Sequence, residues 1–136
     1  MRTGQVEVNG KTYLLCFSAR VVRACAKRYG NLEKLGDALT VGTEVEVMDE
    51  NFWLLAEMMA AGAKYAKEEK IENPEPLDLD RLYDLLDLND ILRMQEILMA
   101  TIAKGNEREV ETEPEKGKNV ETTLQDSLSS GMSGMG

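Results

Sequence analysis

The stretch FWLLAEMMAAGA, residues 52–63, carries one charge, Glu57, in twelve residues. Lysines and glutamates follow it and carry the helical pattern to about Lys70. A helix that is apolar on nearly every side must be covered on every side, by its own chain or by another protein. The stretch is therefore either the centre of this chain's core or partly a surface for a partner.

The apolar side chains of this helix fall on two faces: Phe52, Leu55, Ala56 and Met59 on one, and Leu54, Met58, Ala61 and Tyr65 on the other. A chain of 136 residues covers both faces only if its remaining elements wrap the helix completely. The small residues at positions 60–63 would let another helix come close, from this chain or from a second one.

The composition bounds the class of protein. At 15.2 kDa the chain fits one domain with a real core. Its 16 basic and 25 acidic residues give a net charge of -9, which disfavours general affinity for nucleic acid or an anionic membrane. No apolar run reaches the ~20 residues of a membrane helix, and the N-terminus lacks a signal peptide pattern. The sequence predicts a cytoplasmic protein.

Residues that carry chemistry are scarce. The chain has no histidine, and its cysteines, Cys16 and Cys25, lie in apolar contexts that predict buried thiols. No Gly-rich phosphate loop, nucleophile elbow, EF-hand loop or cluster with metal-ligand spacing occurs. We therefore expect no enzyme activity, no cofactor and no metal site.

The N-terminal segment predicts a β-hairpin from about Gln5 to Phe17. Asn9-Gly10 suits a two-residue type I′ turn, because both residues tolerate positive φ. A lone hairpin is marginal in water, so one face must lie on something apolar. The candidates for that face are Val6, Val8, Tyr13, Leu15 and Phe17.

Helix start and stop signals predict about five helices after the hairpin. The expected caps or first residues are Ser18, Asn31, Asp49 or Glu50, Asp78 and Asn89, and the expected ends are Gly30, Thr40, about Lys70 before ENPEP, about Leu88, and Gly105. The fold class is thus mainly α with an N-terminal hairpin. Residues 1–105 form the expected domain, and 106–136 are polar enough to predict a disordered tail.

The helix after the hairpin carries Arg20, Arg23, Lys27 and Arg28, with no acid between Ser18 and Asn31. Three interpretations stand. With the next helix it resembles a DNA-binding helix-turn-helix. The basic residues are otherwise a solvated face, with the last two favouring the helix end. A third possibility is a face that meets an acidic patch on a neighbouring copy and steers self-assembly.

Methionines mark the two most apolar helices, as Met58 and Met59 on the long one and Met94 and Met99 on the last one. Methionine fills gaps in cores and is also common on surfaces that accept varied partners. In the last helix we expect Ile91, Met94, Leu98 and Ile102 to line one face, widened by Leu92 and Met99.

The chain has the order VEVNGKTYLLCFSARVVRACAKRYGNLEKLGDAL, a Trp-Leu-Leu helix ending GAKYAKEE, then PEPLDLDRLYDLLDLND before a final amphipathic helix. This order resembles the tail assembly chaperones of long-tailed, siphovirus-type bacteriophages, over roughly Val6 to Gly105. Members of that family are small, mainly helical proteins. They bind the long, apolar, helical tape measure protein and keep it soluble while the tail tube polymerises around it. They tend to self-associate, and a longer form is often made by translational frameshifting.

The resemblance implies a non-enzymatic chaperone in the host cytoplasm, absent from the mature virion, whose partners are the tape measure protein and further copies of itself, including a frameshifted longer form. From the residue pattern we expect the partner surface at Phe52, Trp53, Met58, Met59, Met94 and Met99, and self-assembly contacts at Arg20, Arg23, Lys27 and Arg28. Burial of four of the six partner positions within one protomer would favour the core interpretation. The alternatives are a DNA-binding regulator acting through residues 20–38 and a structural tail subunit.

Overall fold

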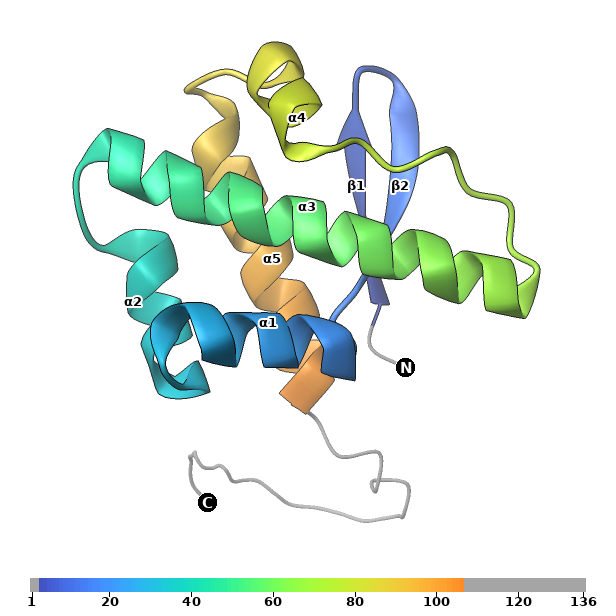
Figure 1. Ribbon diagram of the computed structural model, residues 1–136. Coiled ribbons are helices and arrows are strands. Elements are labelled where there is room, and N and C mark those ends of the chain that lie inside the picture. The colour runs from blue at the N-terminus through green and yellow to red at the C-terminus, as the bar shows by residue number, and fades with distance from the viewer. Residues whose placement is uncertain (1–2, 107–136) are drawn as a thin grey trace, which may run out of the picture. The chain divides into compact units, whose positions relative to one another are not determined.

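The computed structural model describes residues 3–106 as a hairpin followed by helices (Figure 1). In chain order the elements are β1 (Thr3–Val8), β2 (Lys11–Cys16), α1 (Ala19–Tyr29), the 3-10 turn η1 (Leu32–Lys34), α2 (Leu35–Thr40), α3 (Glu44–Glu69), α4 (Leu79–Leu85) and α5 (Asp90–Asn106). This is the mainly helical fold with an N-terminal hairpin that the sequence predicts. Residues 107–136, where the sequence predicts a disordered tail, lie outside the described residues.

The hairpin forms around the predicted turn. β1 and β2 pair antiparallel, with Val8 opposite Lys11. Asn9 and Gly10 have positive φ angles of 53° and 82°, as a type I′ turn requires. The predicted inner face is confirmed, since Val6, Val8, Tyr13, Leu15 and Phe17 are all buried.

Gly62 marks a close contact between α3 and the hairpin, where α3 crosses the two strands (Figure 1). A Cβ atom at this position would collide with the backbone carbonyl of Leu14 in β2. Gly62 therefore accommodates a strand of the same chain, where the sequence analysis considered a neighbouring helix.

Each outer edge of the hairpin has a backbone group bonded to a side chain from elsewhere. On β1, Arg93 of α5 donates from Nη1 to the carbonyl oxygen of Glu7 at 3.0 Å. On β2, the backbone N–H of Leu14 donates to Oδ1 of Asn73 at 2.9 Å. An isolated two-stranded hairpin is marginal and its open edges invite pairing with other chains. These two bonds help to fix the hairpin to the helical part of the domain.

The long helix starts earlier than the sequence analysis predicts. α3 begins at Glu44 rather than at Asp49 or Glu50, because Thr43 and Glu46 form a capping box. The Thr43 hydroxyl accepts from the backbone N–H of Glu46 at 3.1 Å, and the Glu46 carboxylate accepts from the backbone N–H of Thr43 at 2.9 Å. This reciprocal pair satisfies two backbone donors at the helix start. The Thr-x-x-Glu signal was present in the sequence and was overlooked.

Two of the other predicted caps make side-chain capping bonds, and the helix expected to end near Leu88 ends at Leu85. The side chain of Asn31 accepts from the backbone N–H of Lys34, and that of Asp78 from the backbone N–H of Arg81. Ser18 occupies the N-cap position of α1 with extended backbone but makes no side-chain capping bond. The last helix, α5, runs one residue beyond the predicted end at Gly105.

The core forms around α3, which α1, α2, α4 and β2 all contact. The fully buried large side chains that α3 contributes are Phe52, Leu54, Leu55, Met58 and Met59. Cys16 and Cys25 are buried, as predicted. The elements of one chain thus wrap both apolar faces of this helix, and the first of the two interpretations of the stretch 52–63 is the one the structure supports.

Candidate partner-binding surfaces

Four of the six predicted partner-binding side chains belong to the core. Phe52 is 1% exposed, and Met58, Met59 and Met94 are 0% exposed. The sulfur of Met59 also accepts a hydrogen bond from the backbone N–H of Leu77 at 3.2 Å. The assignment of these four positions to a surface is therefore wrong for this structure, because no partner reaches them without opening the core.

The fifth predicted position, Trp53, is half-buried beneath polar groups. Its ring meets the ring of Tyr29 edge-on, with centroids 5.9 Å apart. The guanidinium of Arg28 lies over the indole, 4.5 Å from the centroid. This geometry is a cation–π contact, which stabilises the α1–α3 packing.

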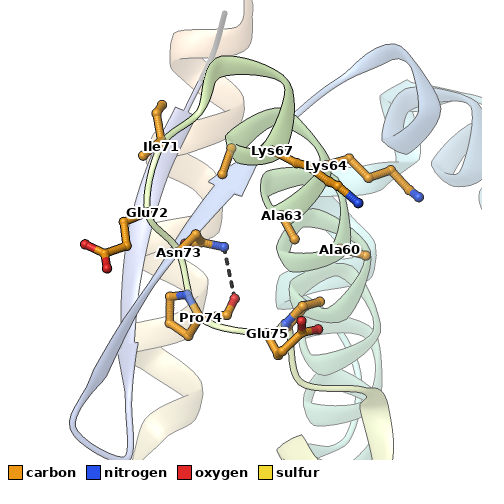
Figure 2. A pocket seen from close by; sticks show the side chains of 11 residues that line it. Ala60, Ala63, Lys64, Lys67, Ile71, Glu72, Asn73, Pro74 and Glu75 are labelled. Atoms are coloured by element: carbon orange, nitrogen blue, oxygen red, sulfur yellow. Dashed lines mark hydrogen bonds between the residues drawn. The ribbon is translucent and has the colours of Figure 1, made fainter.

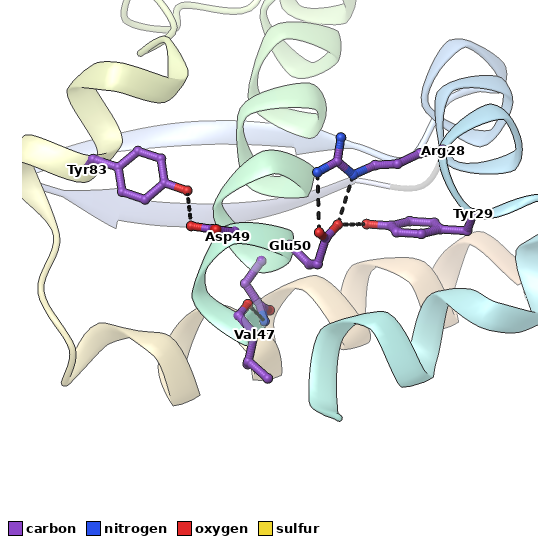
Figure 3. Close-up of polar contacts among 7 residues, drawn as sticks. Arg28, Tyr29, Val47, Asp49, Glu50 and Tyr83 are labelled. Atoms are coloured by element: carbon purple, nitrogen blue, oxygen red, sulfur yellow. Dashed lines mark hydrogen bonds and ion pairs between the residues drawn. The ribbon is translucent and has the colours of Figure 1, made fainter. Parts of the chain in front are cut away.

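The same guanidinium pairs with Glu50 of α3 (Figure 3). Arg28 donates from Nε to Oε1 at 2.8 Å and from Nη2 to Oε2 at 3.3 Å, and the Tyr29 hydroxyl donates to Oε1 at 2.6 Å. The hydrogen bond from Arg28 lowers the pKa of Glu50. Burial, together with the bond to Glu50, raises the pKa of Tyr29. We call Arg28, Tyr29, Glu50 and Trp53 the α1 clamp.

A second polar contact joins α4 to Asp49, the residue before Glu50 in α3. The Tyr83 hydroxyl donates to Oδ1 of Asp49 at 2.6 Å (Figure 3). Burial and this hydrogen bond raise the pKa of Tyr83 to about 12. Asp49 and Glu50 are consecutive residues that face different sides of α3, so the first turns of α3 are tied to α4 and to α1 at the same level.

The α1 clamp removes Arg28 from the basic face that the sequence predicts on α1. Arg28 is neutralised by Glu50, whereas Arg20, Arg23 and Lys27 are exposed. Within residues 3–106 these three cations have no ion-pair partner. They fall within one side of α1, at spacings of three and four residues. The following helix, α2, has only six residues, LGDALT, and no base, so it offers no basic recognition helix for DNA.

The sixth predicted position, Met99, is exposed, and so are two other apolar side chains in or just before α5. Met99 is 42% exposed, Leu92 70% and Leu88 54%. Leu92 and Met99 are seven residues apart and therefore share a face of α5, and Leu88 precedes that face by four residues. Met94 and Leu98 occupy the opposite, buried side. Leu88, Leu92 and Met99 form what we call the outer stripe. The sequence analysis expected Leu92 and Met99 to widen the buried face of α5, and this expectation is wrong, since both are exposed.

A buried polar junction fixes α5 beside α2 and α3. The carbonyl oxygen of Leu39 accepts from Nε2 of Gln95 at 2.6 Å and from Nδ2 of Asn51 at 2.9 Å. Gln95 lies between Leu92 and Met99 in sequence. The Gln95 side chain anchors α5 at the end of α2, and Arg93 anchors it to β1. The outer stripe therefore lies on a helix whose position is fixed.

A groove of about 610 Å³ lies between α3 and the segment 71–76 (Figure 2). Ala60 and Ala63 give it a shallow helical wall, and Pro74 with Ile71 forms part of the other. The rest of the lining includes charges of both signs, from Lys64, Lys67, Glu72 and Glu75. Sequence reasoning missed this groove, because its two walls meet only through the turn after α3.

The described residues offer little for catalysis. Burial raises the pKa of the Cys25 thiol to about 11, so the reactive thiolate is scarce at neutral pH. No three potential metal-binding side chains gather within the described part of the chain. Among residues 3–106, no helix has the length and hydropathy to cross a membrane.

Comparison with protein-family models, with curated proteins and with solved structures gave no match for this chain.

Proposed function

We propose that this protein is a phage tail assembly chaperone that binds the tape measure protein and keeps it soluble, without catalysis, while the tail tube assembles. The resemblance over roughly Val6 to Gly105 supports the family. The observation that carries the site is the outer stripe, since Leu92 and Met99 are exposed apolar side chains on one face of α5 and Leu88 is exposed in the turn just before it. Single exposed apolar residues are ordinary, whereas exposed apolar residues that share one side of a helix, here with the polar Glu96 between Leu92 and Met99, favour an interaction surface.

The stripe suits an apolar helix as client. Leu92 and Met99 are two helical turns apart on α5, so a client helix can lie along α5 with its own apolar positions between them. Methionine at position 99 adapts its shape, which helps when successive client segments differ in sequence. Each contact is small, and several copies on one long client would hold it by avidity.

The charge supports the same role. A client covered by copies of a protein with net charge -9 gains a negatively charged coat, which keeps the complex in solution. The proposal includes self-association, a longer frameshifted form, action in the host cytoplasm and absence from the finished virion. A structural tail subunit would instead be found in purified particles.

Co-expression with the large helical protein encoded just downstream tests the proposal. We expect that protein to stay soluble and to co-purify. Leu92→Asp or Met99→Asp should lower its recovery roughly tenfold, because losing the burial of one such side chain costs about 1.5–3 kcal/mol.

The matched control is Ile71→Asp, the same kind of change at an exposed apolar residue that lines the groove and lies outside the stripe. It should leave recovery unchanged. Loss of recovery with Ile71→Asp and none with the stripe variants would move the client site to the groove. An insoluble client with the wild-type protein would remove the proposal altogether.

A further inference from the structure

We infer that Glu96 makes the outer stripe selective for client helices that carry lysine or arginine beside their apolar side chains. The inference rests on the proposed function and deepens it, because it names the chemical class of client segment that α5 accepts. Three observations carry it: the position of Glu96 on α5, the exposure of its carboxylate, and the packing on the other side of the stripe.

Glu96 lies beside the two stripe residues that belong to α5. It comes four residues after Leu92 and three before Met99. These spacings rotate it by about 40° from Leu92 and about 60° from Met99, in the same direction around the helix axis. A second helix that packs on Leu92 and Met99 therefore passes beside the Glu96 carboxylate.

The opposite side of the stripe is closed by the domain itself. Ile91 and Leu98, each one residue before a stripe residue, are buried. Gln95, half-buried between them in sequence, donates to the carbonyl oxygen of Leu39. A client helix thus meets uncharged, packed side chains on this flank and Glu96 on the open flank.

No group in the described part of the chain neutralises Glu96. Its side chain is exposed and makes no ion pair or hydrogen bond among residues 3–106. Arg93, three residues earlier, is engaged elsewhere, since it donates to the carbonyl oxygen of Glu7 and pairs with Asp90. The net charge of -9 adds to the negative potential. The open flank of the stripe therefore favours a cation.

Packed helices use such flanking charges to select partners. In coiled coils the apolar a positions recur every seven residues, and charges at the e positions pair with the neighbouring helix and set partner choice. With Leu92 and Met99 as a positions, Glu96 takes an e position. A client lysine or arginine beside it gains an ion pair, whereas a client glutamate meets a like charge.

Two synthetic amphipathic helical peptides test the inference, by fluorescence anisotropy with the purified full chain. Both carry leucines at heptad spacing, and they differ only at the flanking positions, which are lysine in one peptide and glutamate in the other. At about 0.05 M salt the wild type should bind the lysine peptide more tightly. Glu96→Lys should bind the lysine peptide roughly fivefold more weakly and the glutamate peptide roughly fivefold more tightly, because attraction and repulsion are exchanged.

Glu72→Lys is the matched control, because it reverses an exposed charge outside α5 and changes the net charge by the same amount. It should keep the wild-type preference, which separates the local effect of Glu96 from the overall negative charge. Leu92→Asp should weaken the binding of both peptides. Equal preferences in Glu96→Lys and Glu72→Lys, peptide binding that Leu92→Asp leaves unchanged, or a wild type that binds neither peptide would each overturn the inference.

Co-expression with the downstream helical protein separates this inference from the proposed function. Glu96→Lys should lower the recovery of that protein roughly fivefold, and Glu72→Lys should leave it unchanged. Full recovery with Glu96→Lys, together with loss in Leu92→Asp, would overturn the charge selection while the proposed function stands. No recovery with the wild type would remove the proposed function, even where the peptides show the preference. Circular dichroism confirms that the variants are folded.

Discussion

Helices α3 and α5 both carry methionines and long apolar runs, yet the structure uses them differently. α3 is enclosed by the hairpin, α1, α2 and α4, and its Met58 and Met59 are fully buried. α5 buries Met94 and Leu98 on one side and exposes Leu92 and Met99 on the other. Apolar density therefore marks the centre of this small domain, whereas the more amphipathic α5 leaves Leu92 and Met99 accessible.

Replacing a methionine with alanine should give the largest difference in the free energy of unfolding between α3 and α5. Met58→Ala should lower the free energy of unfolding by about 2–5 kcal/mol, because it leaves a cavity in the core. Met99→Ala should change it by no more than about 0.5 kcal/mol, as at other exposed positions. Urea denaturation measures both. Equal losses would show that the two methionines share one environment and would remove the contrast.

Glycine substitutions test why α3 is enclosed. Gly62→Ala should destabilise by about 1–3 kcal/mol, because its Cβ would meet the Leu14 carbonyl oxygen and force the strand away. Gly36→Ala in α2 meets nothing within 4 Å and should stabilise by up to about 1 kcal/mol. The same denaturation experiment compares them. A neutral Gly62→Ala would contradict the direct packing of β2 on α3.

The α1 clamp should make a smaller, pH-dependent contribution. The folded-state pKa of Glu50 lies below its ordinary value of 4.5, so its stabilisation is complete above that pH and is lost as pH falls through the folded-state pKa. Glu50→Gln should cost about 1 kcal/mol or less at pH 7, since the pair is partly exposed. The difference between the two proteins should shrink at acidic pH. A difference that stays constant down to pH 2 would assign the effect to packing.

Local signals predicted the fold well. Asn9-Gly10 specified the hairpin turn, and Asn31 and Asp78 specified two helix starts, because each acts on groups within three residues. The start of α3 was also encoded locally, in Thr43 and Glu46, and was missed by giving more weight to acidic residues further on.

The partner surface was less predictable, because exposure depends on contacts between distant residues. Helical spacing placed Met94 and Met99 together on a widened face, and only the packing of α5 separates one as buried and the other as exposed. Likewise, Arg28 looked like part of a basic face until its pairing with Glu50, 22 residues away, was known.

The central claim is that the client contacts α5 and leaves the α3 core intact. Photo-crosslinking tests it most directly, with a photoreactive amino acid placed at position 99 in one variant and at position 71 in another, each co-expressed with the downstream helical protein. We predict a covalent adduct with that protein from position 99 and little or none from position 71. An adduct from position 71 alone, or from neither position in a complex that still co-purifies, would contradict the account.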